Sequence, residues 1–428
     1  NWGFLFYSMT ISELYKIYTK SPIICTNSKV IKKNSIFFAL KGKNFNGNEF
    51  AKQAIYNGCK YAVIDEKKYQ NTNCILVNDV KSTLQDLAEF HRNQITIPII
   101  GITGSNGKTT TKEIVNSILS SKYNCYSTKG NLNNQIGLPL SILEINKFHE
   151  IAVIEMGASE IGEIKKLCKI AKPTSGLITN IGKAHLEGFQ SFEGVIQAKT
   201  ELYHYLIENN GIQFVNNNDD LLIKKSNNKN RITFGKENNS DFTAKLTASS
   251  PLISITIKET KINSNLVGEF QYDNLVGACC IGDFYNVSYK NIKKSIEKYI
   301  PKNNRTELIK TNDNNIILDA YNANPSSMES MIESFIKLDK PNKICILGEM
   351  RELGIYSEAE HQKLINRMNA SKIESILIGE EFLNLTKKNT YLTTSELIDN
   401  ITHYKLTNRT ILIKGSRGIK LEDLVEYL

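Results

Sequence analysis

The chain has 428 residues, of which 41% are apolar and 23% are charged. This composition excludes disorder as the main state, and no run of about 18 apolar residues is present to span a membrane. At roughly 100–200 residues per domain, the length predicts two to four domains with separate cores. The net charge of +9 is spread along the chain and is typical of a solvated surface. An anionic substrate is the second interpretation, and nucleic acid is the third because no basic-aromatic module repeats.

The N-terminal residues and the cysteines give no sign of export. Segment 1–8 is apolar but short, and it has neither a basic start nor a small-residue cleavage site, so we expect no signal peptide. Met9 is interpreted as the natural start, with residues 1–8 as upstream or cloning-derived residues. The eight cysteines include no CxxC pair and no zinc-like spacing, so we expect reduced thiols in a cytoplasmic protein.

The pattern divides the chain into three blocks, and residues 9–95 form the first. It contains the short apolar runs Ser35–Leu40 and Lys60–Asp65, followed by a helical stretch at Lys81–Asn93.

Residues 96–300 form the second block. Ile97–Ile102 predicts a buried strand, and a glycine loop follows it. The next helix has one apolar face, made by Ile114, Val115, Ile118 and Leu119. The apolar runs Ile151–Met156 and Gly176–Ile181 alternate with helical segments, which predicts βαβ units and a parallel sheet. The Asn-rich stretch Asn216–Asn239 is interpreted as a loop or surface excursion.

Residues 301–428 form the third block, in which four apolar runs each precede a loop and a helical pattern. These runs are Ile316–Asp319, Lys343–Leu347, Ile373–Ile378 and Thr410–Lys414. The alternation predicts a second doubly wound α/β domain. We therefore expect an α/β protein with domains at residues 9–95, 96–300 and 301–428.

The segment 103–110 (TGSNGKTT) lies between the predicted strand and the predicted helix of the second block. Glycines let consecutive backbone N–H groups surround phosphate oxygens, and the helix adds its positive end. Lys108 is expected to reach the β- and γ-phosphates, and Thr109 to offer its hydroxyl to Mg²⁺. The full Walker pattern would have glycine at Ile102, so this is a shortened G-x-x-G-K-T loop. A plain strand-to-helix turn is the alternative; the context favours nucleotide binding by Gly104, Ser105, Asn106, Gly107, Lys108, Thr109 and Thr110.

Two further polar residues follow predicted strands of the second block. Glu155 lies near the end of the run Ile151–Met156, and His185 follows the next strand along the chain. Ligands gather at the carboxyl ends of parallel strands, so both residues are candidates for binding Mg²⁺. A solvated edge carboxylate and a satisfied polar histidine are the alternatives, and the spacing alone leaves them open.

Several longer motifs occur in order along the chain. They are TGSNGKTTTKE at the loop, GNLNNQIGLPLS (130–141), AVIEMGASEIGEI (152–164), NIGKAHLEGFQSFEGVIQAKTEL (180–202), LDAYNANPSSM (318–328), GEMRELG (348–354) and ILIKGSRGIKLE (411–422). With these motifs the chain resembles the Mur ligase family, the ATP-dependent amide ligases of peptidoglycan synthesis, over nearly its whole length from Met9. The Asn322–Pro325 and Gly130–Asn134 segments are particularly similar to the member that joins D-alanyl-D-alanine to UDP-N-acetylmuramoyl-tripeptide.

The resemblance implies an N-terminal domain that holds the UDP end, a central P-loop ATPase-type sheet and a C-terminal Rossmann-like domain. It implies that ATP phosphorylates the tripeptide carboxylate and that the D-alanyl-D-alanine amine then attacks the acyl phosphate. It also implies a cytoplasmic enzyme, expected to be a monomer without nucleic-acid partners or stable membrane insertion.

The resemblance assigns roles to individual residues. The catalytic set is Lys108, Glu155, His185 and Lys199. Thr109 and Glu155 correspond to ligands of the ATP-bound Mg²⁺, His185 to a ligand of a second Mg²⁺, and Lys199 to the lysine that the family carbamylates. Asn274 corresponds to an adenine contact, while Arg305 and Asp319 correspond to contacts with ATP phosphate and ribose. By themselves, Lys199 is a helical lysine, Asn274 a helix cap and Arg305 a surface charge.

The substrate residues come from all three blocks. Lys414, Ser416 and Arg417 are expected to face D-alanyl-D-alanine, with Asn322 and Asn324 nearby. A helix-entry turn would explain the glycines around Ser416 equally well. Asn133 and Asn134 are expected to face the UDP-sugar or the peptide, and Ser28 the uridine. Relatives commonly have Asp-Ser-Arg where this chain has Asn27-Ser28-Lys29; lysine keeps the charge but not the bidentate fork of arginine.

Three other functions are alternatives to this ligase. The sibling ligase that adds the third amino acid is disfavoured by the Tyr321–Pro325 segment. A nucleotide-gated switch or small-molecule kinase needs a longer loop and leaves Lys199 and the Lys414–Gly418 loop without a role. A non-catalytic ATP-binding protein would lack the metal-ligand set, whose members are all present here.

Overall fold

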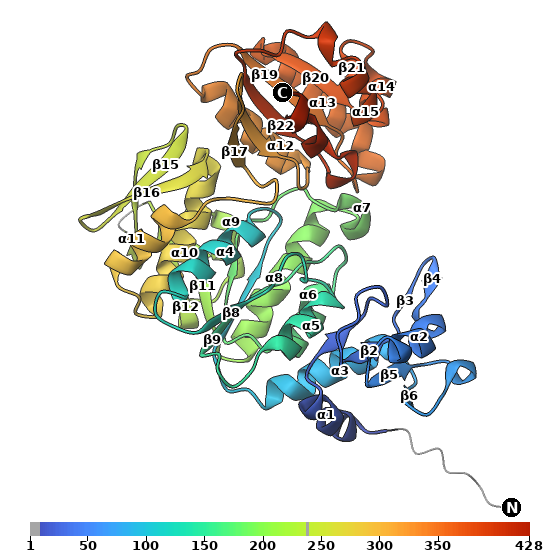
Figure 1. Cartoon of the computed structure of the whole chain (residues 1–428). Coiled ribbons are helices and arrows are strands. Elements are labelled where there is room, and N and C mark those ends of the chain that lie inside the picture. The colour runs from blue at the N-terminus through green and yellow to red at the C-terminus, as the bar shows by residue number, and fades with distance from the viewer. Residues whose placement is uncertain (1–8, 237–238) are drawn as a thin grey trace, which may run out of the picture. The chain divides into compact units, whose positions relative to one another are not determined.

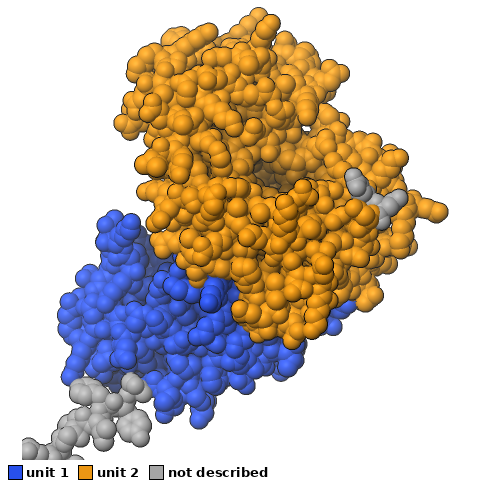
Figure 2. Space-filling model, turned by 180° about the vertical axis from the view of Figure 1, so that it is seen from behind, with its two compact units in different colours: residues 1–101, 123–157, 163–175 blue, residues 102–122, 158–162, 176–428 orange. Residues whose placement is uncertain are grey.

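The computed structural model describes residues 9–236 and 239–428, and the upstream segment 1–8 lies outside the described residues. The chain is an α/β protein with three main sheets in chain order (Figure 1). It divides into two compact units, one made of the residues up to 101, 123–157 and 163–175, the other of residues 102–122, 158–162 and 176–428 (Figure 2). In the part of the chain that the structure describes, no helix is both long and apolar enough to cross a membrane.

The N-terminal sheet has four parallel strands in the order β1-β2-β5-β6. Its strands are β1 (Ile24–Cys25), β2 (Ile36–Phe38), β5 (Tyr61–Ile64) and β6 (Cys74–Leu76), with a hairpin of β3 (Lys41–Gly42) and β4 (Phe45–Asn46) and the helices α1 (Ile11–Lys20), α2 (Ala51–Tyr56) and α3 (Val80–Asn93). Asp79 caps α3 by accepting a hydrogen bond from the Ser82 N–H at 2.6 Å. The predicted helical stretch of the first block is confirmed as α3.

The central sheet has seven strands in the order β13-β12-β11-β10-β7-β9-β8. They are β7 (Ile99–Thr103), β8 (Cys125–Ser127), β9 (Ile151–Glu155), β10 (Ser175–Ile178), β11 (Ile212–Asn216), β12 (Arg231–Gly235) and β13 (Phe242–Thr243). The accompanying helices are α4 (Lys108–Leu119), α5 (Gly137–Glu144), α6 (Glu163–Ala171), α7 (Leu186–Phe189), α8 (Phe192–Glu208), α9 (Asp220–Lys225), α10 (Tyr272–Phe284) and α11 (Tyr289–Lys298). The predicted apolar face of α4 is confirmed, because its four residues are fully buried.

The interpretation of Asn216–Asn239 as a loop was wrong. Asp219 caps α9 by accepting from the N–H groups of Leu221 and Leu222, and Leu222 is fully buried. β12 pairs in parallel with β11, and Phe234 is only 2% exposed. Single apolar residues among many Asn and Lys concealed this βαβ unit. A small antiparallel sheet that follows it, β14 (Lys245–Ala248), β15 (Leu252–Ile257) and β16 (Thr260–Val267), was not predicted.

The C-terminal sheet has six strands in the order β17-β18-β22-β19-β20-β21, parallel except for β17. They are β17 (Glu307–Lys310), β18 (Asn315–Asp319), β19 (Lys343–Gly348), β20 (Glu374–Ile378), β21 (Thr390–Tyr391) and β22 (Thr410–Lys414). Its helices are α12 (Pro325–Lys337), α13 (Ser357–Ser371), α14 (Glu380–Leu385) and α15 (Thr394–Asp399). Alternate strand residues enter two separate cores, one with α12, α13 and α14 and the other with α15. Two covered faces confirm the predicted doubly wound domain.

One of these two cores extends beyond the C-terminal sheet. Leu186 and Phe189 of α7 and Val195 of α8 pack in the same apolar cluster as Met328 of α12 and Met350. The α7 segment therefore packs against the helices of the C-terminal sheet within one compact unit.

Candidate functional site

The loop between β7 and α4 needs glycine at two positions. Gly104 has φ +141° and Gly107 has φ +78°, which side-chain-bearing residues rarely adopt. A Cβ on Gly104 would lie 2.0 Å from Thr179 Oγ1, and one on Gly107 would lie 2.5 Å from Asn274 Oδ1. Backbone strain and close packing therefore both exclude a side chain at these positions.

The residues that follow β10 hold this loop in place. Thr179 Oγ1 donates to the Asn106 carbonyl at 2.6 Å, and the Ser105 N–H donates to the Asn180 carbonyl at 2.9 Å. The Asn180 side chain bonds Asn106 twice, accepting from its N–H at 3.1 Å and donating to its carbonyl at 3.1 Å. Neither Thr179 nor Asn180 was among the predicted site residues. Polar residues directly after a strand next to β7 are the signal that would have identified them.

Lys108 and Asn274 lie at the same loop. Lys108 Nζ donates to the carbonyls of Gly104 at 2.7 Å and Ser105 at 3.0 Å, so a cation lies against the loop at the start of α4. Asn274 is 6% exposed, and its Nδ2 donates to Gln271 Oε1 at 2.8 Å. A cation beside a glycine loop and a helix N-terminus forms an environment that attracts phosphate.

Glu155 belongs to the other compact unit and is a buried carboxylate. It is 1% exposed, its Oε1 accepts a hydrogen bond from Asn133 Nδ2 at 2.7 Å, and its own N–H donates to Thr128 Oγ1 at 3.0 Å. A Cβ on Gly157 would lie 2.9 Å from Asn133 Cγ, so this glycine leaves room for the Asn133 amide. A carboxylate so far removed from water needs cations or donors around it, which suits a metal ligand.

Two other predicted substrate residues of this unit, Asn134 and Ser28, lie in turns where the hydrogen bonds are made between residues close in sequence. Asn134 Oδ1 accepts from the N–H groups of Ile136 at 3.0 Å and Gly137 at 2.9 Å, where α5 begins. Ser28 lies half-buried in a turn after β1, and the neighbouring Lys29 N–H donates to Asn27 Oδ1 at 2.9 Å. Their contacts to a substrate stay predictions.

His185 and Lys199 both lie close to the ring of Phe189. The rings of His185 and Phe189 meet edge to face at 6.2 Å, and Lys199 Nζ lies 5.0 Å from the Phe189 ring centroid. Lys199 is 1% exposed and donates to the Ala158 carbonyl at 3.2 Å. The structure therefore brings these two predicted metal-site residues to one apolar side chain.

Glu352, which the sequence analysis did not select, contacts His185. Its Oε2 faces His185 Nδ1 in a close ion-pair contact, and this contact lowers the pKa of the Glu352 carboxyl. The Glu187 N–H also donates to the Glu352 carbonyl at 3.2 Å. Glu352 was within the GEMRELG motif, but one sequence shows no reason to prefer it over Glu349.

The Asn322–Pro325 segment reaches the nucleotide loop. Asn324 Nδ2 donates to Asn106 Oδ1 at 2.7 Å, and Asn324 Oδ1 caps α12 by accepting from the Ser327 N–H at 2.9 Å. Asn322 is exposed, and its Oδ1 accepts from the Ala323 N–H at 2.9 Å. Of the two predicted asparagines, only Asn324 lies at the loop.

Two arginines share one tyrosine at the C-terminal sheet. The Arg305 guanidinium carbon lies 3.5 Å from the Tyr321 ring centroid, and that of Arg417 lies 5.4 Å from it. Lys414 Nζ lies 2.6 Å from Asp319 Oδ2, and this lysine is 1% exposed. The structure therefore gathers Arg305, Asp319, Lys414 and Arg417, while the tyrosine that joins the arginines was not predicted.

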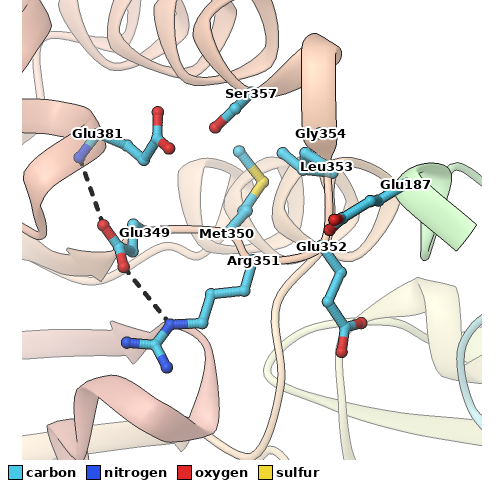
Figure 3. A pocket seen from close by; sticks show the side chains of 9 residues that line it. All are labelled: Glu187, Glu349, Met350, Arg351, Glu352, Leu353, Gly354, Ser357 and Glu381. Carbon is cyan, nitrogen blue, oxygen red and sulfur yellow. Dashed lines mark hydrogen bonds and ion pairs between the residues drawn. The ribbon is translucent and has the colours of Figure 1, made fainter.

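Ser416 connects this cluster to a pocket of about 290 Å³ (Figure 3). Its Oγ accepts from the Arg351 N–H at 3.1 Å, and its own N–H donates to the Glu349 carbonyl at 3.3 Å. In the pocket, Arg351 Nε lies 3.5 Å from Glu349 Oε1, and the Glu381 N–H donates to Glu349 Oε2 at 3.4 Å. The loop after β22 is thus bonded to the loop after β19.

The described residues contain no group of three or more His, Cys, Asp or Glu side chains that could hold a metal ion. Mg²⁺ is commonly held by one or two carboxylates together with substrate phosphates. The buried Glu155 carboxylate has the chemistry of such a ligand. The Thr109 hydroxyl, in the first turn of α4, is also an oxygen ligand of the kind that Mg²⁺ accepts.

The comparisons with known proteins agree with this geometry. The sequence matches the family profiles "Mur ligase family, catalytic domain" over residues 22–100, "Mur ligase middle domain" over 102–282 and "Mur ligase, glutamate ligase domain" over 304–417. The UDP-N-acetylmuramoyl-tripeptide–D-alanyl-D-alanine ligase of Bacillus subtilis (strain 168) is 32% identical over 424 residues, covering 95% of this chain and 92% of that protein. The crystal structure of MurF from Acinetobacter baumannii has a TM-score of 0.85 and 29% identity, covering 95% and 92% of the two chains. MurF ligase from Thermotoga maritima in complex with ADP has a TM-score of 0.81 and 28% identity, covering 95% and 96%.

Proposed function

Because the chain belongs to the Mur ligase family, we propose that it joins D-alanyl-D-alanine to UDP-N-acetylmuramoyl-tripeptide with cleavage of ATP to ADP and phosphate. It is an ATP-dependent ligase that forms an amide bond and releases ADP and phosphate. The observation that carries this function is the near-full-length similarity to ligases of that name, one of which was solved with ADP. The bond between Asn324 and Asn106 supports it, because it joins the segment typical of this ligase to the nucleotide loop.

The reaction has two steps. A carboxylate oxygen of the tripeptide attacks the γ-phosphorus of ATP, and ADP leaves. The D-alanyl-D-alanine nitrogen then attacks the acyl carbon of the acyl phosphate, loses a proton and expels inorganic phosphate. Lys108 neutralises repulsion between the triphosphate and the carboxylate, while the loop N–H groups fix the phosphates for in-line transfer.

The ATP site that we propose extends beyond the loop. Gly104, Ser105, Asn106, Gly107, Lys108, Thr109 and Thr110 hold the phosphates. Asn274 contacts the adenine, and Arg305 and Asp319 contact phosphate and ribose. Asn274 lies directly against the nucleotide loop, since its Oδ1 is 2.5 Å from where a Cβ on Gly107 would lie. This proximity supports the assignment of Asn274 to the ATP site.

Mg²⁺ would be held by Thr109 and Glu155, and a second Mg²⁺ by His185 and a carbamylated Lys199. When bound, these ions supply charge neutralisation for phosphoryl transfer. The burial of Lys199 at 1% exposure supports the modification, because carbamylation replaces a buried cation with a metal-binding anion. We expect activity to fall in CO₂-depleted buffer and to return with bicarbonate, whereas a Lys199→Gln variant stays inactive under both conditions.

Substrate contacts follow the resemblance. D-alanyl-D-alanine is bound by Lys414, Ser416 and Arg417, together with Asn322 and Asn324. The UDP-sugar or the peptide is faced by Asn133 and Asn134. Ser28 faces the uridine. The three domains that we propose are the N-terminal domain (residues 9–95), the central domain (96–300) and the C-terminal domain (301–428). The enzyme acts in the cytoplasm as a monomer, without nucleic acid and without stable membrane insertion.

The decisive experiment measures phosphate release from ATP and Mg²⁺ by the full chain, with each substrate alone and with both. We expect turnover only when UDP-N-acetylmuramoyl-tripeptide and D-alanyl-D-alanine are both present, with a pentapeptide product by mass spectrometry and none from a Lys108→Ala variant. Tripeptides that carry diaminopimelate or lysine establish which third residue is accepted. Turnover with a dipeptide substrate and a diamino acid would instead indicate the sibling ligase. ATP hydrolysis indifferent to muramyl substrates would favour a nucleotide switch.

A further inference from the structure

The loop that follows β19 reaches α7 through Glu352. Its carboxylate contacts His185 Nδ1, and its carbonyl accepts the Glu187 N–H at 3.2 Å. In Figure 3 the Glu352 side chain points away from the Glu349–Arg351 ion pair of the same loop. Within this loop, Glu352 is therefore the acidic residue whose side chain contacts His185.

Both partners have an uncommon backbone conformation. His185 has φ +51° and Glu352 has φ +62°, and neither is glycine. Such conformations cost of order 1 kcal/mol or more and persist where surrounding structure holds them. Here the Tyr356 hydroxyl donates to the Gln190 carbonyl at 3.3 Å, and Leu186 packs in one core with Leu353. These further contacts hold the loop against the α7 segment next to the His185–Glu352 contact.

The contact has the chemistry of a supported metal ligand. A metal-binding histidine commonly offers one ring nitrogen to the metal and its other N–H to a carboxylate, which fixes the tautomer and the ring orientation. With Nδ1 directed at Glu352, Nε2 is the nitrogen available to a metal ion. The nearby ring of Phe189, edge-on at 6.2 Å, restricts the imidazole further.

We propose that Glu352 is the positioning residue for His185, so that the C-terminal domain orients this metal ligand through the loop after β19. The inference rests on the proposed metal-binding role of His185. Its consequence is that the second metal site becomes competent only while this loop is docked on α7.

The test measures Mn²⁺ binding to the full chain in the presence of a non-hydrolysable ATP analogue. Pulsed EPR reports coupling of Mn²⁺ to an imidazole nitrogen, and a Mn²⁺ titration reports affinity, so neither readout depends on turnover. The variants are Glu352→Ala, the conservative Glu352→Asp and His185→Ala. Glu360→Gln is the matched control, because Glu360 bonds Lys183 Nζ at 2.6 Å in the same contact region without touching His185.

We expect nitrogen coupling in the unmodified protein, none in His185→Ala, and a roughly 10–100-fold weaker Mn²⁺ site with reduced coupling in Glu352→Ala. Glu352→Asp and Glu360→Gln should stay close to the unmodified protein. Unchanged coupling and affinity in Glu352→Ala would overturn the positioning role alone. An equal loss in Glu360→Gln would also overturn it, since general docking would then explain the effect. Absence of coupling in the unmodified protein would instead reject His185 as a ligand, and this inference with it.

Discussion

Asn324 Nδ2 donates a hydrogen bond to Asn106 Oδ1 at 2.7 Å, although the two residues are 218 positions apart. Asn106 belongs to the nucleotide loop, whereas Asn324 begins α12 of the C-terminal domain. The bond couples the conformation of the loop to the position of the segment that is expected to face the incoming amine.

Replacing Asn324 by serine separates its two roles. Serine can still cap α12, but it is too short to reach Asn106, so stability should stay near that of the unmodified protein while kcat/KM for ATP falls about three- to tenfold. Asn324→Ala should lose the cap as well, at about 1 kcal/mol of unfolding free energy. Steady-state kinetics and denaturant unfolding provide the two readouts, with Asn366→Ser, an exposed position of α13 outside the proposed site, as control. Unchanged kinetics in Asn324→Ser would mean that the bond does not serve catalysis.

The Lys414–Asp319 pair is a buried ion pair whose side chains are 2% and 17% exposed. Removing one partner leaves an uncompensated buried charge, so Lys414→Met and Asp319→Asn should each lower the free energy of unfolding by about 3–5 kcal/mol. The double variant should be less destabilised than the sum of the two, because the charges then disappear together. Denaturant unfolding measures all three variants.

The control for that pair is Lys363–Glu329, whose side chains are both 62% exposed and separated by 3.7 Å. Lys363→Met should change the free energy of unfolding by less than about 1 kcal/mol. Strict additivity of the Lys414 and Asp319 variants would show that the two charges do not interact.

Tyr321 provides one ring to Arg305 and Arg417. Loss of this ring should release both guanidinium groups, at about 0.5–2 kcal/mol for each cation–π contact. Tyr321→Leu should therefore raise KM for both ATP and D-alanyl-D-alanine, each by roughly 2- to 30-fold. Tyr321→Phe keeps the ring and should behave like the unmodified protein. Equal defects in Tyr321→Phe and Tyr321→Leu would assign the effect to the hydroxyl.

His361 makes stability depend on pH. It is fully buried, Nε2 accepts the Met350 N–H at 2.9 Å, and burial lowers the pKa of its imidazole below the ordinary 6.5. The unfolded chain then binds more protons than the folded one, so stability is complete above about pH 6.5 and falls as the pH decreases below it. His91, whose pKa burial also lowers, adds a second loss of the same sign.

His361→Gln should reduce the dependence of unfolding free energy on pH between about 7 and 5 without abolishing it, because His91 remains. Denaturant unfolding across this range measures the slope. Exposed His204 is the matched control, and His204→Gln should leave the slope unchanged. A slope in His361→Gln equal to that of the unmodified protein would contradict the assignment.

The elements and motifs that depend on local pattern could be predicted. The strands of the C-terminal sheet are runs of branched apolar residues, and Gly107 directly precedes Lys108 in a recognisable loop that begins at Gly104. Hydrophobic periodicity and the backbone conformations of glycine are properties of residues close in sequence, so these features can be recognised without the tertiary structure. The β11-α9-β12 unit was missed because its buried residues, such as Leu222 and Phe234, stand singly among polar ones.

The sequence by itself determined the α/β class, the nucleotide loop and the family of this protein, because each is written in contiguous residues. Only the tertiary structure decided that Glu352 contacts His185, that Tyr321 lies beside two arginines and that Asn324 reaches Asn106. Each of these contacts links residues from different strands, helices or loops. Such choices depend on how sheets and helices pack, and short-range patterns do not record that packing.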